Sequence, residues 1–191
     1  MTQAQEVVYI DANVFAYRLL KDPNYDNFLN LSTSFFDDID TGKYRGVTST
    51  YTKIEYIGIL KKVISYIRQS YITPIEEQIA LDDFQQFVDG LEISLTDADA
   101  LACDGLNSTL FHLTSETLRS TKPYFHKKAT ERRQWMNMGG ADALQINLAM
   151  RSGANRFATF DRGFKGLNNP SIIPLIIQEE YASASRTHPT I

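Results

Sequence analysis

Four acidic residues occupy positions where the side chains of an α/β protein commonly meet. Asp11 and Asp161 each follow a short apolar run, EVVYI and RFATF respectively. Asp142 begins an apolar helical segment, and Glu55 lies early in another. In a parallel sheet, the carboxyl ends of the strands and the amino ends of the following helices share one edge, where ligands bind. The four carboxylates are therefore predicted to converge at that edge.

Such a convergence would have a definite chemistry. Carboxylates packed together raise one another's pKa, so a cluster of them makes sense only when a cation neutralises it. An all-oxygen ligand set without histidine or cysteine favours Mg²⁺ or Mn²⁺. These cations orient a water molecule, lower its pKa and neutralise charge at a phosphorus centre. The pattern predicts metal-assisted hydrolysis of phosphodiesters, with Asp11, Glu55, Asp142 and Asp161 as catalytic metal ligands.

Each acid also has a simpler explanation when it is considered alone. An aspartate after a strand commonly forms a turn or caps a helix, which would account for Asp11 and Asp161. Asp142 would complement the dipole of its helix. Glu55 would be a solvated charge on a helix surface. The joint pattern of all four favours the catalytic interpretation.

The segments that must position these acids alternate between strand and helix. Apolar, β-rich runs predict strands at 6–10, 44–49, 91–95, 156–160 and 171–177. Apolar spacings of three and four, with capping signals, predict helices at 13–20, 28–40, 51–68, 74–88, 96–105 and 141–152. Pro174 places the last strand at an edge or a bulge. This alternation predicts an α/β fold with a mostly parallel central sheet and helices on both faces, a three-layer α/β/α sandwich.

The composition is that of an ordinary globular domain, with 191 residues, 43% hydrophobic and 22% charged. We expect one domain over 1–178 and a loose polar tail at 179–191. The net charge of −4 argues against general coating of nucleic acid but allows a local basic strip. Cys103 is the only cysteine, so an intramolecular disulfide or a cysteine-based zinc site is excluded. With no signal-peptide pattern and no apolar run of membrane-spanning length, the chain is predicted to be cytoplasmic and to have no membrane partner.

The motifs resemble those of the PIN-domain ribonucleases, and in particular the VapC-type toxins of toxin–antitoxin pairs. IDANVF is similar to the opening D-x-N-hydrophobic motif of that family, and ATFDRGF is similar to its T-x-D-x-x-F ending. Between them, Glu55 lies in the helix after a Ser/Thr-rich strand, and the sequence ADAL contains Asp142. The resemblance covers the two ends of the chain, about residues 6–65 and 139–177.

This resemblance implies a flavodoxin-like topology and Mg²⁺- or Mn²⁺-dependent cleavage of single-stranded or structured RNA. It implies that the four acids bind the metal, while Asn13 and Thr159 support the site by hydrogen bonds to a carboxylate or a metal-bound water. Water held by the metal would attack in line and leave the RNA 2′-hydroxyl unused. The products would carry 5′-phosphate and 3′-hydroxyl ends. For toxin members, the resemblance further implies a homodimer and inhibition by a cognate antitoxin.

The chain departs from the compact toxins between Glu55 and Asp142, where it is longer. The excess falls mostly in 106–138, which we expect to be a mostly helical insertion or flap. Its stretch RSTKPYFHKKATERRQW combines cationic groups with aromatic rings, as single-stranded RNA binding does. The alternative is a solvated helix with its aromatic rings in the core. The candidate RNA contacts in this stretch are Lys122, Lys127, Lys128, Arg132 and Arg133.

Arg162 and Lys165, beside Asp161, are two further candidate RNA contacts, and the alternative for both is an ordinary surface charge. Two other functions are also open. One is a catalytically silent PIN-like module that binds RNA or a protein partner, although the presence of all four acids argues against it. The other is an acid-cluster phosphatase or phosphotransfer enzyme, but no D-x-D motif follows the first strand.

Overall fold

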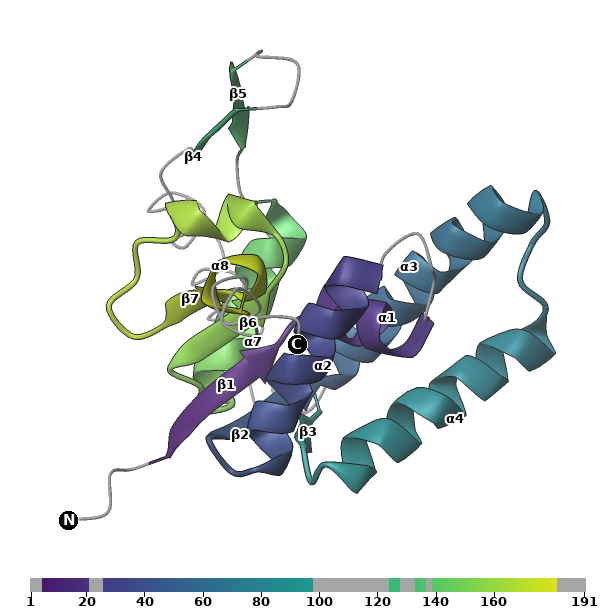
Figure 1. Cartoon of the computed structure of the whole chain (residues 1–191), viewed down its shortest axis with the longest axis horizontal. Helices are drawn as coiled ribbons and strands as arrows, with labels where there is room; N and C mark the ends of the chain where they lie inside the picture. The colour runs from purple at the N-terminus through teal and green to yellow at the C-terminus, as the bar shows by residue number, and fades with distance from the viewer. Residues whose placement is uncertain (1–4, 21–25, 98–123, 128–132, 137–138, 182–191) are drawn as a thin grey trace, which may run out of the picture.

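A computed structural model of the chain describes residues 5–20, 26–97, 124–127, 133–136 and 139–181 (Figure 1). Five strands form one sheet in the order β3-β2-β1-β6-β7, and every neighbouring pair is parallel. The strands are β1 (Glu6–Ile10), β2 (Tyr44–Ser49), β3 (Ser94–Thr96), β6 (Arg156–Thr159) and β7 (Ile173–Ile176). As predicted for a proline-containing strand, β7 lies at an edge of the sheet.

The strand order has a reversal at its centre. From β1 the chain builds outward through β2 to β3, and then β6 and β7 are added on the other side of β1. The carboxyl ends of β1 and β6 therefore flank a topological switch point. In open parallel sheets, the crevice at this point is where ligands usually bind.

Helices cover both faces of the sheet. The described helices are α1 (Ala12–Leu20), α2 (Asp26–Asp40), α3 (Thr50–Arg68), α4 (Pro74–Gly90), α7 (Gly140–Arg151), α8 (Ile177–Tyr181) and the short 3₁₀ helix η2 (Arg162–Gly166). Side chains alternate between the two faces of a strand. In β1, Val8 and Ile10 pack into a cluster with α1, α2, α4 and α8, whereas Tyr9 packs with α7 and η2. The α/β/α prediction is therefore confirmed. The flavodoxin-like topology that the resemblance implies is wrong, because that topology places the first strand between the second and the third, whereas β1 lies between β2 and β6.

Local signals explain where several of these helices begin. Thr73 and Glu76 form a reciprocal capping box at the start of α4, with Pro74 at the first helical position. Ser49 caps α3. The helical backbone of α7 is followed by Gly153, whose φ of +78° is in the left-handed region that favours glycine.

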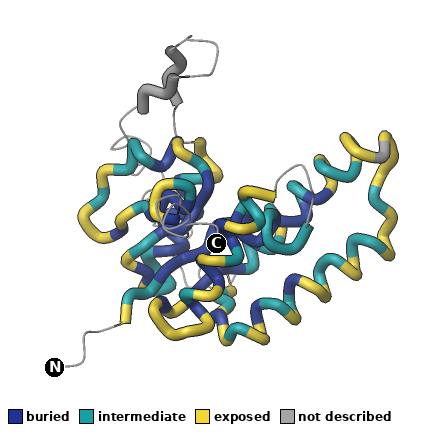
Figure 2. The backbone as a smooth tube through the Cα atoms, viewed as in Figure 1, coloured by how far each residue is buried: buried dark blue, intermediate teal, exposed yellow. Residues whose placement is uncertain are grey.

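The helical hairpin of α3 and α4 extends away from the sheet, and much of its far end is exposed (Figures 1 and 2). Tyr66, Tyr71 and Ile75 there are largely exposed, in contrast to the fully buried strand residues. None of the described helices combines the length and the apolar character needed to cross a lipid bilayer.

The insertion at 106–138 differs from the prediction where the structure describes it. Residues there form an antiparallel hairpin of β4 (Tyr124–Lys127) and β5 (Arg133–Met136), so a mostly helical structure is wrong for these segments. Aromatic residues on both strands favour the pleated backbone, and Phe125 is paired with Trp135. The remainder of the insertion, and most of the predicted helix at 96–105, lie outside the described residues.

The predicted loose tail at 179–191 is wrong at its beginning. Residues 179–181 belong to α8, and the Tyr181 ring is buried in the core. The Tyr181 hydroxyl also donates to the Asp38 carboxylate of α2 at 2.5 Å. The buried Tyr181 ring explains why this segment is ordered as a helix, although its composition is mostly polar. Residues 182–191 lie outside the described part of the chain.

Candidate active site

Asp11 lies directly after β1, at the switch point. Its backbone N–H donates to the Ala158 carbonyl of β6 at 3.0 Å, so its position is fixed by the sheet. Its side chain is buried, and one carboxylate oxygen, Oδ2, accepts hydrogen bonds from Thr159 Oγ1 at 2.6 Å and Asn13 Nδ2 at 2.5 Å. Asp11 is therefore a buried carboxylate held by two side-chain donors.

The same donors join the ends of β1 and β6. Asn13 Nδ2 also donates to Thr159 Oγ1 at 3.0 Å, and Asn13 Oδ1 accepts the Phe160 N–H at 3.0 Å. Thr159 Oγ1 in turn accepts the Asp161 N–H at 2.9 Å. Asn13 and Thr159 thus form a hydrogen-bonded bridge between the segments that carry Asp11 and Asp161.

Asp161 and Asp142 each cap a helix. Asp161 is the N-cap residue of η2, and its Oδ1 accepts the Gly163 N–H at 2.7 Å. In the first turn of α7, Asp142 Oδ2 accepts the Gly139 N–H at 2.7 Å. The local capping roles weighed in the sequence are therefore both present. They do not exclude a shared site, because a carboxylate has a second oxygen.

Glu55 lies in the second turn of α3 and is partly buried. Its Oε2 accepts a hydrogen bond from Gln145 of α7, and its carboxylate also interacts with the Tyr51 hydroxyl. Burial, and then the charge of Asp11, raise the pKa of Glu55 to about 7, with a smaller contribution from Asp142. The solvated surface charge considered in the sequence does not describe this residue.

Burial and the charge of a neighbouring carboxylate also raise the pKa of Asp11 and of Asp142. Burial, with a smaller contribution from the charge of Asp142, raises the pKa of Asp11 to about 6, although the hydrogen bond from Thr159 acts in the opposite direction. The pKa of Asp142 is also raised, first by burial and then by the charge of Asp161, against the lowering effect of the Gly139 N–H. The four acids therefore form one electrostatically connected group at the carboxyl edge of the sheet.

They do not form a closed cluster. Among the described residues, no three His, Cys, Asp or Glu side chains lie close enough together to hold a metal ion. Asp142, Asp161, Asp11 and Glu55 each accept hydrogen bonds from donors of the protein itself. Each carboxylate thus has at least one oxygen directed toward a donor of the protein, which offsets part of the repulsion between like charges. The predicted approach of all four within coordination distance is not seen.

The chemical character of the site nevertheless fits a hard dication. The acids offer only oxygen ligands, as Mg²⁺ and Mn²⁺ prefer. A further oxygen lies beside them: Gln145 Oε1 is buried and has no hydrogen-bond partner in the described part of the chain. An unpartnered buried carbonyl is unfavourable unless a donor or a cation satisfies it.

Sequence reasoning missed two residues of the site, Gln145 and Tyr51. Gln145 is three positions after Asp142, and Tyr51 is four positions before Glu55. Residues at these spacings lie on the same face of a helix. The helical period around each predicted acid is therefore the signal that would have found them.

The predicted RNA contacts have different placements. Arg162 Nε donates to Gln178 Oε1 at 3.0 Å, and Lys165 forms an ion pair with Glu179, so both basic residues of η2 contact α8. Lys127 and Arg133 are a register pair of the β4–β5 hairpin, and β4 lies beside η2. Lys122, Lys128 and Arg132 are outside the described residues.

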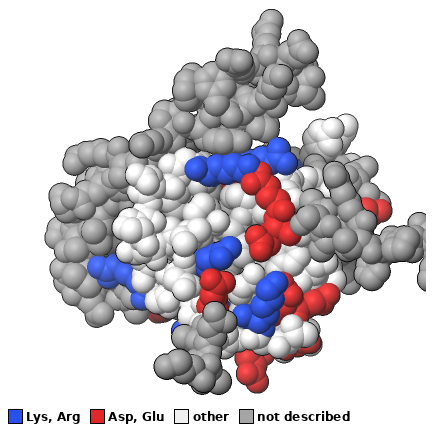
Figure 3. Space-filling model, turned by 60° about the vertical axis from the view of Figure 1, so that its left-hand side comes forward, with Lys and Arg blue, Asp and Glu red and all other residues white. Residues whose placement is uncertain are grey.

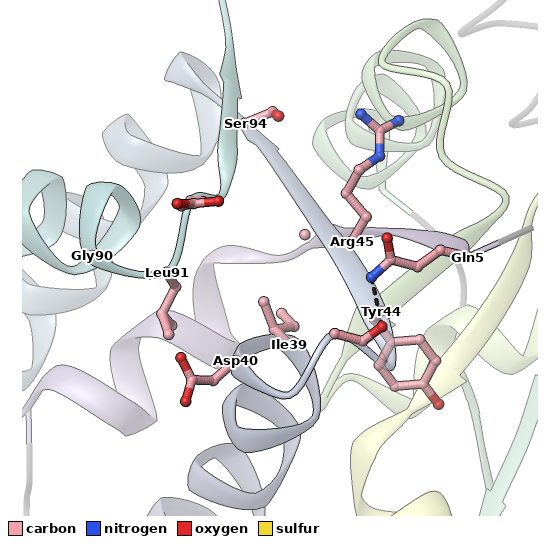
Figure 4. A pocket seen from close by; sticks show the side chains of 11 residues that line it. Gln5, Ile39, Asp40, Tyr44, Arg45, Gly90, Leu91 and Ser94 are labelled. Carbon is pink, nitrogen blue, oxygen red and sulfur yellow. Dashed lines mark hydrogen bonds between the residues drawn. The ribbon is translucent and has the colours of Figure 1, made fainter.

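The described surface does not carry a continuous basic strip on the face shown in Figure 3, where basic groups stand beside acidic ones. A separate hollow lies at the opposite, amino-terminal edge of the sheet (Figure 4). Gln5, Arg45 and Ser94 contribute to its wall, and Gln5 Nε2 donates to the Gly42 carbonyl at 2.6 Å. None of the predicted site residues lines this hollow.

Comparison of the chain with models of known protein families finds no match, and comparison with curated proteins finds none. A functional conclusion must therefore come from the residues at the switch point and their geometry.

Proposed function

We propose that this chain is a divalent-metal-dependent endoribonuclease of the PIN-domain type. One observation carries the proposal: the two acids at the carboxyl ends of β1 and β6, Asp11 and Asp161, are bridged through Asn13 and Thr159. The charge of Asp142 raises the pKa of Asp11, and the charges of Asp11 and Asp142 raise the pKa of Glu55. Acidic groups at a topological switch point support a site for a charged ligand.

The four acids would hold Mg²⁺ or Mn²⁺ through their carboxylate oxygens. When bound, the cation supplies a polarised water and neutralises charge at the phosphorus atom. Thr159 and Asn13 would keep the Asp11 carboxylate oriented. Burial and like charge raise the pKa of Asp11 to about 6 and that of Glu55 to about 7, so Glu55 is partly protonated near neutral pH, and a cation bound there would displace its proton.

RNA is the substrate that we infer. Hydrolysis by water would give 5′-phosphate and 3′-hydroxyl ends. The β4–β5 hairpin beside η2 supports a role in contacting RNA, because its register pairs two basic positions, Lys127 and Arg133, and β4 lies next to the helix that follows Asp161. A homodimer, a cognate antitoxin and a cytoplasmic location belong to the same proposal.

The decisive experiment is cleavage of an end-labelled single-stranded RNA in Mn²⁺ or in EDTA. We expect cleavage by the wild type in Mn²⁺ only, and loss of cleavage in Asp142→Asn. The amide oxygen of asparagine still accepts the Gly139 N–H, so α7 should keep its cap. Asp82→Asn, an exposed acid on α4, is the matched control and should cleave as the wild type does.

One observation favours a catalytically silent binding module instead. Each of the four carboxylates already accepts a hydrogen bond from the protein, and no three of them are gathered for a metal within the described residues. RNA binding without cleavage, equal in Mn²⁺ and in EDTA, would establish that alternative. Phosphate release from small esters without RNA cleavage would instead indicate a phosphatase.

A further inference from the structure

Gln145 occupies a distinctive position between the acids. It lies one turn after Asp142 on α7 and is only 3% exposed. Its Nε2 donates to Glu55 Oε2, and the same polar side chain lowers the pKa of Asp11. A neutral amide therefore acts on two carboxylates that come from different elements, α3 and the end of β1.

The oxygen of the same amide, Gln145 Oε1, makes no comparable interaction within the described part of the chain. Gln145 Oε1 is buried and has no hydrogen-bond partner among the described residues. Because Oε1 and Nε2 are attached to one carbon, this oxygen is also at the acidic edge. The amide thus places an unsatisfied acceptor next to carboxylate acceptors, an arrangement that is unfavourable until a positive or donor group is present.

A cation would reverse these preferences. Amide carbonyls of Asn and Gln are common ligands of hard dications. The terminal torsion of glutamine is broad and roughly two-fold, so exchange of the oxygen and nitrogen positions needs little movement of the side chain. Once a cation neutralises Glu55, the N–H donor of the amide is no longer required there.

We propose that Gln145 is a fifth ligand residue of the metal site. Its amide nitrogen donates to Glu55, and its oxygen binds the cation, directly or through one water. This inference rests on the proposed function, since it concerns the same cation.

The test is titration of the full chain with Mn²⁺ in EDTA-free buffer at pH 8, followed by calorimetry and by the electron paramagnetic resonance signal of free Mn²⁺. Gln145→Met keeps the length of the side chain but removes both polar atoms. We expect it to bind Mn²⁺ about tenfold more weakly than the wild type. Asn147→Leu is the control, because it removes another buried amide from α7, one that donates to the Ala143 carbonyl of its own helix.

Gln145→Glu separates the ligand role from a purely structural one. A glutamate oxygen can bind the cation but cannot donate to Glu55. We therefore expect a lower metal-free melting temperature than that of the wild type, a Mn²⁺ affinity at least equal to it, and a larger melting-temperature increase on adding Mn²⁺. This variant also keeps the test informative if Gln145→Met does not fold.

Wild-type Mn²⁺ affinity in Gln145→Met, or equal weakening in Gln145→Met and Gln145→Glu, would overturn the ligand role while leaving the nuclease proposal intact. A wild-type protein that binds no Mn²⁺ would overturn the metal site itself, and Gln145 with it. The wild-type titration therefore distinguishes the two failures.

Discussion

Asp11 shows how one side chain can be both well held and unfavourably charged. Two donors, Thr159 and Asn13, fix one of its carboxylate oxygens, yet burial raises its pKa to about 6. Desolvation of the charged form is therefore the larger effect. A carboxylate kept ionised in such a position lowers the stability of the folded protein.

This imbalance predicts a pH dependence of folding. The pKa of Asp11 is raised from 3.8 to about 6 and that of Glu55 from 4.5 to about 7, so between about pH 4 and pH 7 the folded protein binds more protons than the unfolded chain. The free energy of unfolding must then fall as pH rises through this window. Asp11 alone contributes on the order of 2–3 kcal/mol to this decrease in the free energy of unfolding. Urea unfolding in EDTA at several pH values measures the decrease.

Asp11→Asn supplies the comparison for that measurement. Asparagine retains an oxygen that accepts the hydrogen bonds of Thr159 and Asn13, but it does not titrate. The variant should therefore be more stable than the wild type at pH 8 and should lose part of the decline between pH 4 and pH 7. A decline of the same size in Asp11→Asn would show that the carboxyl of Asp11 is not its source.

For the individual residues, the sequence indicates which acids lie at the ends of strands and helices, but not which groups each carboxylate contacts. Asp11 and Asp161 were located because they follow apolar runs, and a strand's end is visible in such a pattern. Gln145 was missed because a glutamine in an apolar helix carries no chemical signature by itself. The direction of each side chain depends on burial and on nearby donors, which the pattern does not contain.

Among the elements, those with a strong period or cap were the predictable ones. The helix at α3 and the capping box of α4 follow from apolar spacing and from Thr73 and Glu76. The β4–β5 hairpin was not predictable in the same way, because two short strands stabilise each other by pairing across the chain rather than by a local period. Likewise, α8 depends on a tertiary contact of one ring, that of Tyr181.

That contact predicts the behaviour of the carboxyl-terminal helix. Tyr181 packs near Phe35 and donates to Asp38, so it fastens α8 to α2. Tyr181→Ala should lower the free energy of unfolding by about 3 kcal/mol, since it removes a buried ring. Tyr181→Phe keeps the ring and removes only the hydroxyl, so it should cost about 1 kcal/mol. Urea unfolding of both variants measures the difference.

Equal losses in the two variants would mean that the hydroxyl, rather than the ring, secures α8. A loss below about 1 kcal/mol in Tyr181→Ala would mean that α8 contributes little to the fold.

For the whole molecule, alternation of strands and helices predicted the fold class, but not the order of the strands. The order β3-β2-β1-β6-β7 arises from how the crossover connections pack, and it decides that Asp11 and Asp161 are neighbours. With the reverse placement of β6, the same motifs would lie on different parts of the edge. The hydrogen bonds that join these distant segments are therefore the part of the site that only the three-dimensional structure supplies.

If the proposed function holds, the stability of the whole domain should respond to a cation at the switch point. A cation that binds only the folded state stabilises it by about 2.7 kcal/mol at a concentration one hundred times the Kd. Protons compete for the same oxygens, because the pKa values of Asp11 and Glu55 are raised to about 6 and about 7. Mn²⁺ should therefore raise the melting temperature clearly at pH 8 and only slightly at pH 5.

Thermal unfolding followed by circular dichroism, with and without Mn²⁺ at both pH values, measures this difference. Asp11→Asn should abolish most of the Mn²⁺-dependent increase at pH 8, whereas Asp82→Asn, on the exposed surface of α4, should retain it. An equal increase at both pH values, or one that persists in Asp11→Asn, would assign the cation to other groups. The pH dependence matters because only coupled, partly protonated carboxylates predict it, and a nonspecific effect of Mn²⁺ on surface charges does not.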